Sequence, residues 1–134
     1  MFDAGALIAL ERGDHQIHKV HRLATEHGYQ IVGITPVIAE WWRRGKREKE
    51  RARILRTLVI EPPDVHVARR AGEAIGLVQA TVVDALVMAA ASIRSDTVYT
   101  SDLVDLRRCS RCFRPSRSSR CSASRGRDSR VQAA

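Results

Sequence analysis

Long apolar runs, cysteine and aromatic residues are scarce over most of this sequence. No stretch approaches the ~20 apolar residues that a membrane-spanning helix needs, and no signal-peptide pattern opens the chain, so we expect a cytoplasmic protein without membrane contact. Residues 1–106 contain no cysteine, which fits a reducing compartment. Aromatic residues make up 4% of the chain against 44% for all hydrophobic residues, which predicts an aliphatic core. A G-x-G-x-x-G fingerprint is also missing, which argues against a dinucleotide-binding enzyme.

The formal net charge of +8 comes from one end of the chain. Residues 107–134 contain nine arginines and one acid, Asp128, whereas residues 1–106 carry equal numbers of basic and acidic side chains. The basic character therefore describes a tail and not the whole protein. We predict a folded domain over residues 1–106 and an irregular Arg/Ser/Cys-rich tail over residues 107–134, whose few apolar side chains cannot offset the entropy of ordering. Such a tail would leave the last strand of the sheet with an unpaired edge.

Short apolar segments alternate with helical patterns along residues 1–106. Capping residues such as Asp14 and Asp64, and the Thr35-Pro36 pair, mark helix starts. This alternation is typical of an α/β fold, here a three-layer α/β/α arrangement around a short parallel sheet. Helices are expected over 4–10, 14–28, from 35 onward, and over 46–56, 64–76 and 81–93, and strands over 29–34, 58–60 and 97–100.

Four acids occupy positions that a parallel sheet would bring to one edge. Asp3 follows a first short strand, and Asp102 follows the last one. Glu40 lies in the helix after the second strand, and Asp84 opens a later helix. Reaction sites in such folds lie beyond the carboxyl ends of the strands. Carboxylates gathered there repel one another unless a cation neutralises them, and hard oxygen ligands select Mg²⁺ or Mn²⁺.

Each of these acids also has a purely structural interpretation. Asp3 and Asp102 can be helix N-caps, whose carboxylates accept backbone N–H groups. Asp84 stands three residues after Thr81, which is the spacing of a capping box. Glu40 can be a solvated helix residue. The sequence leaves both interpretations open for every one of the four.

The chain resembles the PIN-domain ribonucleases, in particular the VapC-type toxins of bacterial toxin–antitoxin pairs. The likeness spans residues 1–106, and four segments carry it in register: Asp3-Ala-Gly-Ala-Leu-Ile-Ala-Leu, Thr35-Pro-Val-Ile-Ala-Glu40-Trp, Thr81-Val-Val-Asp84-Ala-Leu-Val and Tyr99-Thr-Ser-Asp102. The resemblance implies a Mg²⁺- or Mn²⁺-dependent endoribonuclease that works as a homodimer and is held inactive by a cognate antitoxin.

The resemblance also implies roles for individual residues. The metal-binding and catalytic acids would be Asp3, Glu40, Asp84 and Asp102, with Ser101 assisting in the Thr-Ser-Asp turn. A metal held by the three aspartates would lower the pKa of a bound water and neutralise charge on the phosphate. Glu40 would complete the metal shell or orient the attacking water as a general base. No covalent enzyme intermediate is needed, which fits a domain without cysteine.

Basic residues after the second strand offer contacts for RNA. Arg43 and Arg44 follow Trp41-Trp42 and can touch RNA phosphates, although a solvated face is an equal alternative. Trp41 lies on an apolar stripe, so we expect it in the core. Three histidines recur at every third position of the second helix, at 15, 18 and 21, but they drift around the helix and so make a poor metal site.

The tail departs from the resemblance, because relatives continue with an amphipathic helix and a final apolar strand. One hypothesis is a frameshift near codon 108 of a GC-rich gene, since a shifted reading permits a Leu- and Val-rich helix end, turn and strand. The alternatives are a functional RNA-binding tail and a zinc knuckle built from Cys109, Cys112 and Cys121, which lacks a fourth ligand. Only Met1 and Phe2 precede Asp3, so an upstream start is also expected.

Two further functions stay open at this point. A non-catalytic α/β module can bind RNA through its Arg-rich tail, and such binding would disappear with the tail. A phospho-receiver of the flavodoxin-like class is disfavoured, because residues 95–106 contain no lysine at a strand end to pair with a phosphoryl group.

Overall fold

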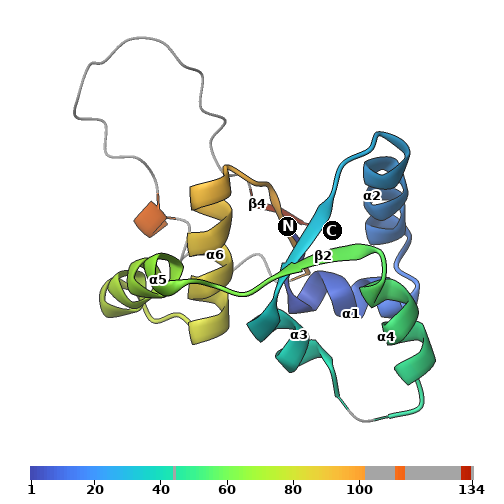
Figure 1. The fold of residues 1–134 in the computed structure, drawn as a ribbon, viewed down its shortest axis with the longest axis horizontal. Coiled ribbons are helices and arrows are strands. Elements are labelled where there is room, and N and C mark those ends of the chain that lie inside the picture. The colour runs from blue at the N-terminus through green and yellow to red at the C-terminus, as the bar shows by residue number, and fades with distance from the viewer. Residues whose placement is uncertain (44, 102–110, 114–130, 134) are drawn as a thin grey trace.

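The protein is a mixed α/β fold in which short parallel strands alternate with helices, as the sequence predicts (Figure 1). The structure is a computed structural model and describes residues 1–43, 45–101, 111–113 and 131–133. No helix in these ranges is long and apolar enough to cross a membrane. The elements are α1 (Ala4–Arg12), α2 (His15–Glu26), β1 (Ile31–Ile34), α3 (Thr35–Trp41), α4 (Glu48–Leu55), β2 (Leu58–Glu61), α5 (Val65–Leu77), α6 (Val82–Arg94), β3 (Val98–Thr100), the 3₁₀ turn η1 (Arg111–Phe113) and β4 (Val131–Ala133).

Two parallel strand pairs are linked by the first residues of the chain. β1 pairs with β2, with Ile31 opposite Leu58, and β3 pairs with β4. Phe2 lies between the pairs: its N–H donates to the carbonyl of Val32 at 2.9 Å, and it forms a parallel bridge with Tyr99. All these pairings are parallel, so the carboxyl ends of the strands point to the same edge. Asp3, directly after the bridge, lies at that edge.

Side-chain caps begin four of the helices. The carboxylates of Asp3, Asp14 and Asp64 accept backbone N–H groups in the first turns of α1, α2 and α5. The Thr81 hydroxyl accepts the N–H of Asp84 at the start of α6. Each cap satisfies a donor that the helix itself leaves unpaired. The two caps predicted from sequence, at Asp14 and Asp64, are confirmed, as is the capping-box contact between Thr81 and Asp84.

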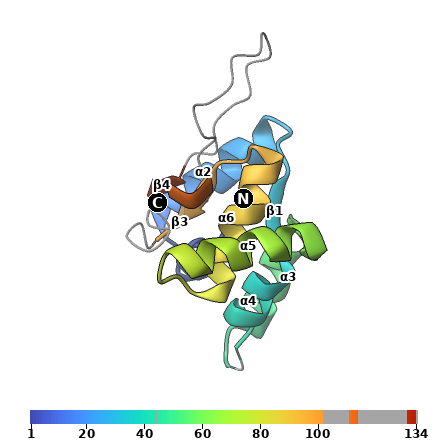
Figure 2. The same cartoon turned by 90° about the vertical axis from the view of Figure 1, so that its left-hand side faces the viewer.

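The core is aliphatic, with Phe2 and Trp41 as its large aromatic exceptions. Both aromatic side chains are about 1% exposed, so the prediction that Trp41 belongs to the core is confirmed. α5 crosses α6 (Figures 1 and 2), and the two helices pack through buried small residues, among them Ala71, Ala85 and Ala89. Small side chains let the two helices approach closely, which keeps the N-terminal end of α6 in place.

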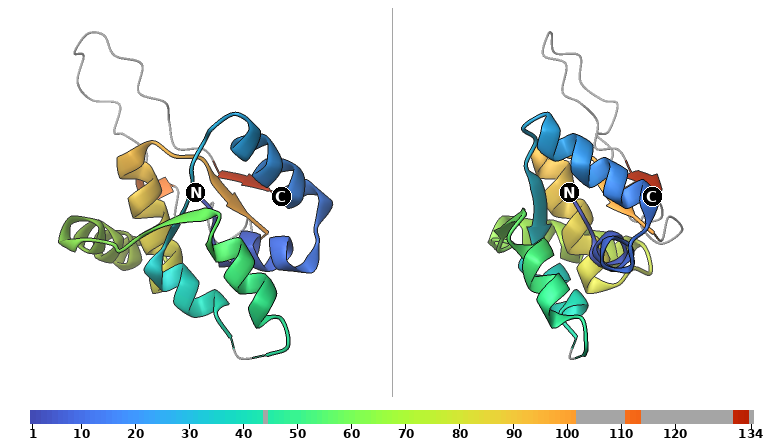
Figure 3. Two further views of the ribbon diagram at one scale, coloured as in Figure 1. Left: turned by 45° about the vertical axis from the view of Figure 1, so that its right-hand side comes forward. Right: turned by 90° about the vertical axis from the view of Figure 1, so that its right-hand side faces the viewer.

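Two short segments of the tail, at residues 111–113 and 131–133, pack against the domain, which the sequence did not predict. β4 pairs in parallel with β3, with Val98 opposite Val131, and lies beside it in both views of Figure 3. Phe113 is half-buried against α5 and α6, with the Arg70 guanidinium 5.7 Å from its ring centre. The expectation that β3 keeps an unpaired edge is therefore wrong, and so is the expectation of an irregular tail at these residues. The physical reason is that strand pairing uses backbone groups and requires little apolar surface.

A half-buried ion pair joins α1 to α4. The Glu11 carboxylate accepts from Arg51 Nε at 3.0 Å and from Arg51 Nη2 at 3.2 Å, and also from the indole N–H of Trp41 at 3.0 Å. The Glu11 and Arg51 side chains are 7% and 13% exposed. These hydrogen bonds, with that from Arg51 first in effect, hold the pKa of Glu11 below its ordinary value. The carboxylate is thus ionised and satisfied.

Removing Arg51 should destabilise the protein, because it leaves a poorly solvated carboxylate without its charged partner. We expect Arg51→Ala to lower the free energy of unfolding by about 2 kcal/mol. The matched control is Arg53→Ala on the same helix, whose guanidinium pairs with Glu50 at 2.7 Å but is 73% exposed. That variant should leave the urea midpoint almost unchanged. Equal losses in the two variants would contradict a special role for the Glu11–Arg51 pair.

Candidate active site

Asp3 is a helix cap, but an unusually buried one. It is 6% exposed, whereas the capping residues Asp14 and Asp64 are exposed. Its carboxylate accepts the N–H of Ala6 at 2.7 Å and a hydrogen bond from the side chain of Thr100, a fully buried residue of β3. The cap needs only the first of these interactions and does not require burial. The structural interpretation of Asp3 is therefore correct and also incomplete.

The charge of Asp3 is opposed by two of the other predicted acids. Burial is the largest influence and raises the pKa of Asp3 from 3.8 to about 6. The hydrogen bonds from Thr100 and Ala6 lower it, and the negative charges of Asp84 and Glu40 raise it further. Coulomb interaction of this kind weakens with distance and with solvation. Glu40 of α3 and Asp84 of α6 therefore lie near enough for their charges to act on the Asp3 carboxylate.

Asp84 and Glu40, whose charges act on Asp3, belong to two other helices, α6 and α3. Asp84 is half-buried in the first turn of α6, where the Thr81 hydroxyl lies 2.6 Å from its Oδ2 and donates to it. Asp84 therefore takes part in the cap of α6 and also acts on the charge of Asp3. Glu40 is exposed near the end of α3, and its backbone carbonyl accepts from Arg43 Nε at 3.1 Å.

Two residues singled out from the sequence lie outside the described ranges, namely Asp102 and Arg44. Of the three predicted metal ligands, the structure therefore describes Asp3 and Asp84 but not Asp102. In the described part of the chain, no three acidic, histidine or cysteine side chains lie close enough to hold a metal ion. The donor chemistry nevertheless fits a hard divalent cation, since a buried carboxylate facing two like charges gains most from a cation beside it.

Gly5 and Thr100 belong to this site, although the sequence did not single out either of them. A methyl group on Gly5 would overlap the Ser101 hydroxyl, lie 3.2 Å from the Ser101 backbone nitrogen and lie 3.4 Å from Asp3 Oδ1. Glycine thus lets α1 approach the end of β3, which brings the exposed Ser101 next to Asp3. The available signals were weak: a polar residue in an otherwise apolar strand for Thr100, and a glycine in a first helical turn for Gly5.

The histidines of α2 have packing roles. His18 Nε2 is 3.0 Å from the carbonyl of Leu10, and His21 Nε2 is 2.8 Å from the Thr57 hydroxyl. Burial, with a smaller effect of the positive charge of His18, lowers the pKa of His21. These contacts tie α2 to α1 and to the segment before β2. Of the knuckle cysteines, Cys109 and Cys121 lie outside the described ranges.

No family model, curated protein or solved structure matches this chain.

Asp3→Asn should stabilise the metal-free protein at neutral pH. The folded state binds the Asp3 proton more tightly than the unfolded state, since its pKa is raised from 3.8 to about 6. The stability that Asp3 contributes is thus full below about pH 4 and is lost as the pH rises through about 6. Asparagine keeps the cap without the charge, so we expect a gain of about 1–3 kcal/mol at pH 7.5 that disappears near pH 4.

Denaturant unfolding in the presence of a chelator at both pH values measures this effect. The control is Asp64→Asn, the same change at an exposed cap, which should give no gain at either pH. A loss of stability from Asp3→Asn at pH 7.5 would contradict the claim that burial and nearby negative charges disfavour the ionised form of Asp3.

Proposed function

We propose that the chain is a Mg²⁺- or Mn²⁺-dependent endoribonuclease of the PIN kind, the toxin of a VapC-type toxin–antitoxin pair. The observation that carries the proposal is the buried Asp3, whose pKa near 6 reflects its burial and the charges of Asp84 and Glu40. A stability cost of this kind at a strand edge is characteristic of functional sites and unnecessary for a cap. The motif resemblance supplies the reaction class, which the acids alone leave open.

Different residues of the site would bind the cation, orient the attacking water and contact the phosphate. Asp3 and Asp84, with Asp102, would hold the cation, which when bound lowers the pKa of a water and neutralises charge on the phosphate. Thr100 and the N–H of Ala6 fix the Asp3 carboxylate in one orientation. Glu40, the exposed acid, would orient the attacking water and accept its proton. The Ser101 hydroxyl, next to Gly5, would donate to a phosphate oxygen.

The remaining parts of the proposal concern architecture and partners. A three-layer PIN-like α/β/α arrangement agrees with the parallel strand pairs and with the helices that connect them. A cognate antitoxin, a homodimer and a cytoplasmic location follow from the toxin assignment alone.

A non-catalytic RNA-binding module is the second candidate. It is favoured by the nine arginines of residues 107–134, which carry one acid among them. Under this hypothesis, RNA affinity would come from counterion release and would not depend on the acids.

Substitution of the acids separates the two candidates. We expect Asp3→Asn and Asp84→Asn to abolish Mn²⁺-dependent cleavage of a labelled RNA, and Glu40→Gln to slow it about 100-fold or more. Asp64→Asn, the same change at an exposed cap that is not one of the proposed ligands, is the matched control and should cleave like the wild type. Cleavage that persists in both aspartate variants, or a wild type that binds RNA and cuts none with either metal, would overturn the nuclease proposal.

A further inference from the structure

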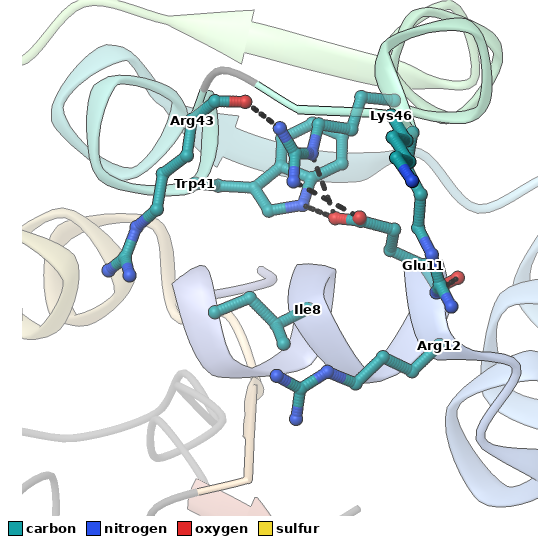
Figure 4. A pocket seen from close by; sticks show the side chains of 8 residues that line it. Ile8, Glu11, Arg12, Trp41, Arg43 and Lys46 are labelled. Atoms are coloured by element: carbon teal, nitrogen blue, oxygen red, sulfur yellow. Dashed lines mark hydrogen bonds and ion pairs between the residues drawn. The ribbon is translucent and has the colours of Figure 1, made fainter.

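A basic pocket lies between the second half of α1, the end of α3 and α4 (Figure 4). Its volume is about 380 Å³, within the range of small-ligand sites. Five of the side chains that line it are cationic and one is a carboxylate: Arg12, Arg43, Lys46, Arg47, Arg51 and Glu11. A concave surface with so unequal a balance of charge favours an anionic ligand.

The one carboxylate of the pocket is already neutralised. Glu11 accepts hydrogen bonds from Arg51 and from the indole of Trp41, which form the floor of the pocket. Arg47 and Arg43 donate to neutral backbone carbonyls, those of Glu11 and Glu40, at 3.0 and 3.1 Å. Such bonds hold a guanidinium in position without cancelling its charge. Four of the five positive charges therefore have no acid among the residues that line the pocket.

Arg12 and Lys46 are the most available of these cations. Both are exposed, and within the described ranges neither side chain has a recorded hydrogen bond or ion pair. In Figure 4 the Arg12 side chain runs along α1 beneath Ile8, on the same side as the Arg43 guanidinium.

The pocket is adjacent to the acidic site along two helices. Asp3 caps α1, and the helix reaches the pocket at Ile8, which is roughly 8 Å further along a helix that rises 1.5 Å per residue. On α3, Glu40 immediately precedes Trp41, which lines the pocket. A polymer lying across the acids therefore reaches the pocket within a few of its units.

We propose that this pocket binds a non-scissile backbone phosphate of single-stranded RNA, beside the acids that would cut the strand. The proposal rests on the proposed function for the identity of the polymer. Trp42 favours a nucleic acid over an acidic peptide, because this residue is 38% exposed and directly follows Trp41, which lines the pocket. Its ring lies edge-on to that of Trp41, with 6.1 Å between the ring centres. An exposed indole beside a phosphate site offers a stacking surface for a base.

The test is equilibrium binding of a fluorescein-labelled single-stranded oligoribonucleotide to the full chain in EDTA, followed by anisotropy over a range of salt concentrations. The pocket variant is Arg12→Gln with Lys46→Gln. The control is Lys19→Gln with Arg69→Gln, which removes the same charge from two exposed positions on α2 and α5. The arginine-rich tail is identical in all three proteins, so its contribution to binding cancels.

We expect several-fold weaker binding for the pocket variant, and a slope of log affinity against log salt that is smaller by about 0.7, since one phosphate contact is lost. The control should match the wild type in both quantities. Equal losses in the two variants, or no loss in the pocket variant, would overturn the proposal. A Glu-rich peptide that binds the wild type and fails on the pocket variant, while RNA binding is unchanged, would assign the pocket to a protein partner and overturn it too.

Failure of this proposal can be distinguished from failure of the proposed function. Binding in EDTA does not require cleavage, so Asp84→Asn should keep its RNA affinity while losing its activity. A protein that binds through the pocket but never cuts would refute the nuclease, and one that cuts normally without Arg12 and Lys46 would refute the phosphate pocket.

Discussion

The burial of the Asp3 carboxylate is the constraint on which the described site depends. A capping aspartate is more stable when water reaches it, as at Asp14 and Asp64, yet Asp3 is enclosed between α1 and β3. Two neighbours make this enclosure possible: Thr100 supplies a hydrogen bond from a buried strand, and Gly5 has no side chain to keep Ser101 away. The resulting pKa near 6 marks a group whose charge the fold alone does not fully compensate.

α1 connects this acidic site to a region of opposite charge. Its first residue follows Asp3, and its last turn contributes Glu11 and Arg12 to the basic pocket. The Glu11–Arg51–Trp41 contacts fix the helix against α3 and α4, so the acids and the cations keep their relative positions. A negatively charged polymer would be attracted by the cations and would meet the acids with a metal between them. Stability and the proposed function thus depend on the same helix.

Local features of the fold were predictable from sequence, and long-range ones were not. Caps at Asp14 and Asp64, the alternation of strands and helices, and the burial of Trp41 follow from spacing within a few residues. The Glu11–Arg51 pair joins residues 40 positions apart and leaves no periodic signal. The pairing of β4 with β3 was missed because backbone hydrogen bonds carry it. For the candidate site, the sequence singled out Asp3, Glu40 and Asp84, whose charges interact in the structure. Thr100 and Gly5 act through proximity that only the folded chain reveals.

The central claim is that burial and nearby negative charges disfavour the ionised form of Asp3, and that a divalent cation beside it would stabilise that form. Its most direct test is the titration of the Asp3 side-chain carboxyl carbon by NMR, first in chelator and then with Mg²⁺. The account predicts a midpoint near pH 6 without metal, from the ordinary value of 3.8, and a fall of about one pH unit or more when Mg²⁺ is added. A midpoint near 3.8 in chelator, or one that Mg²⁺ does not move, would contradict it.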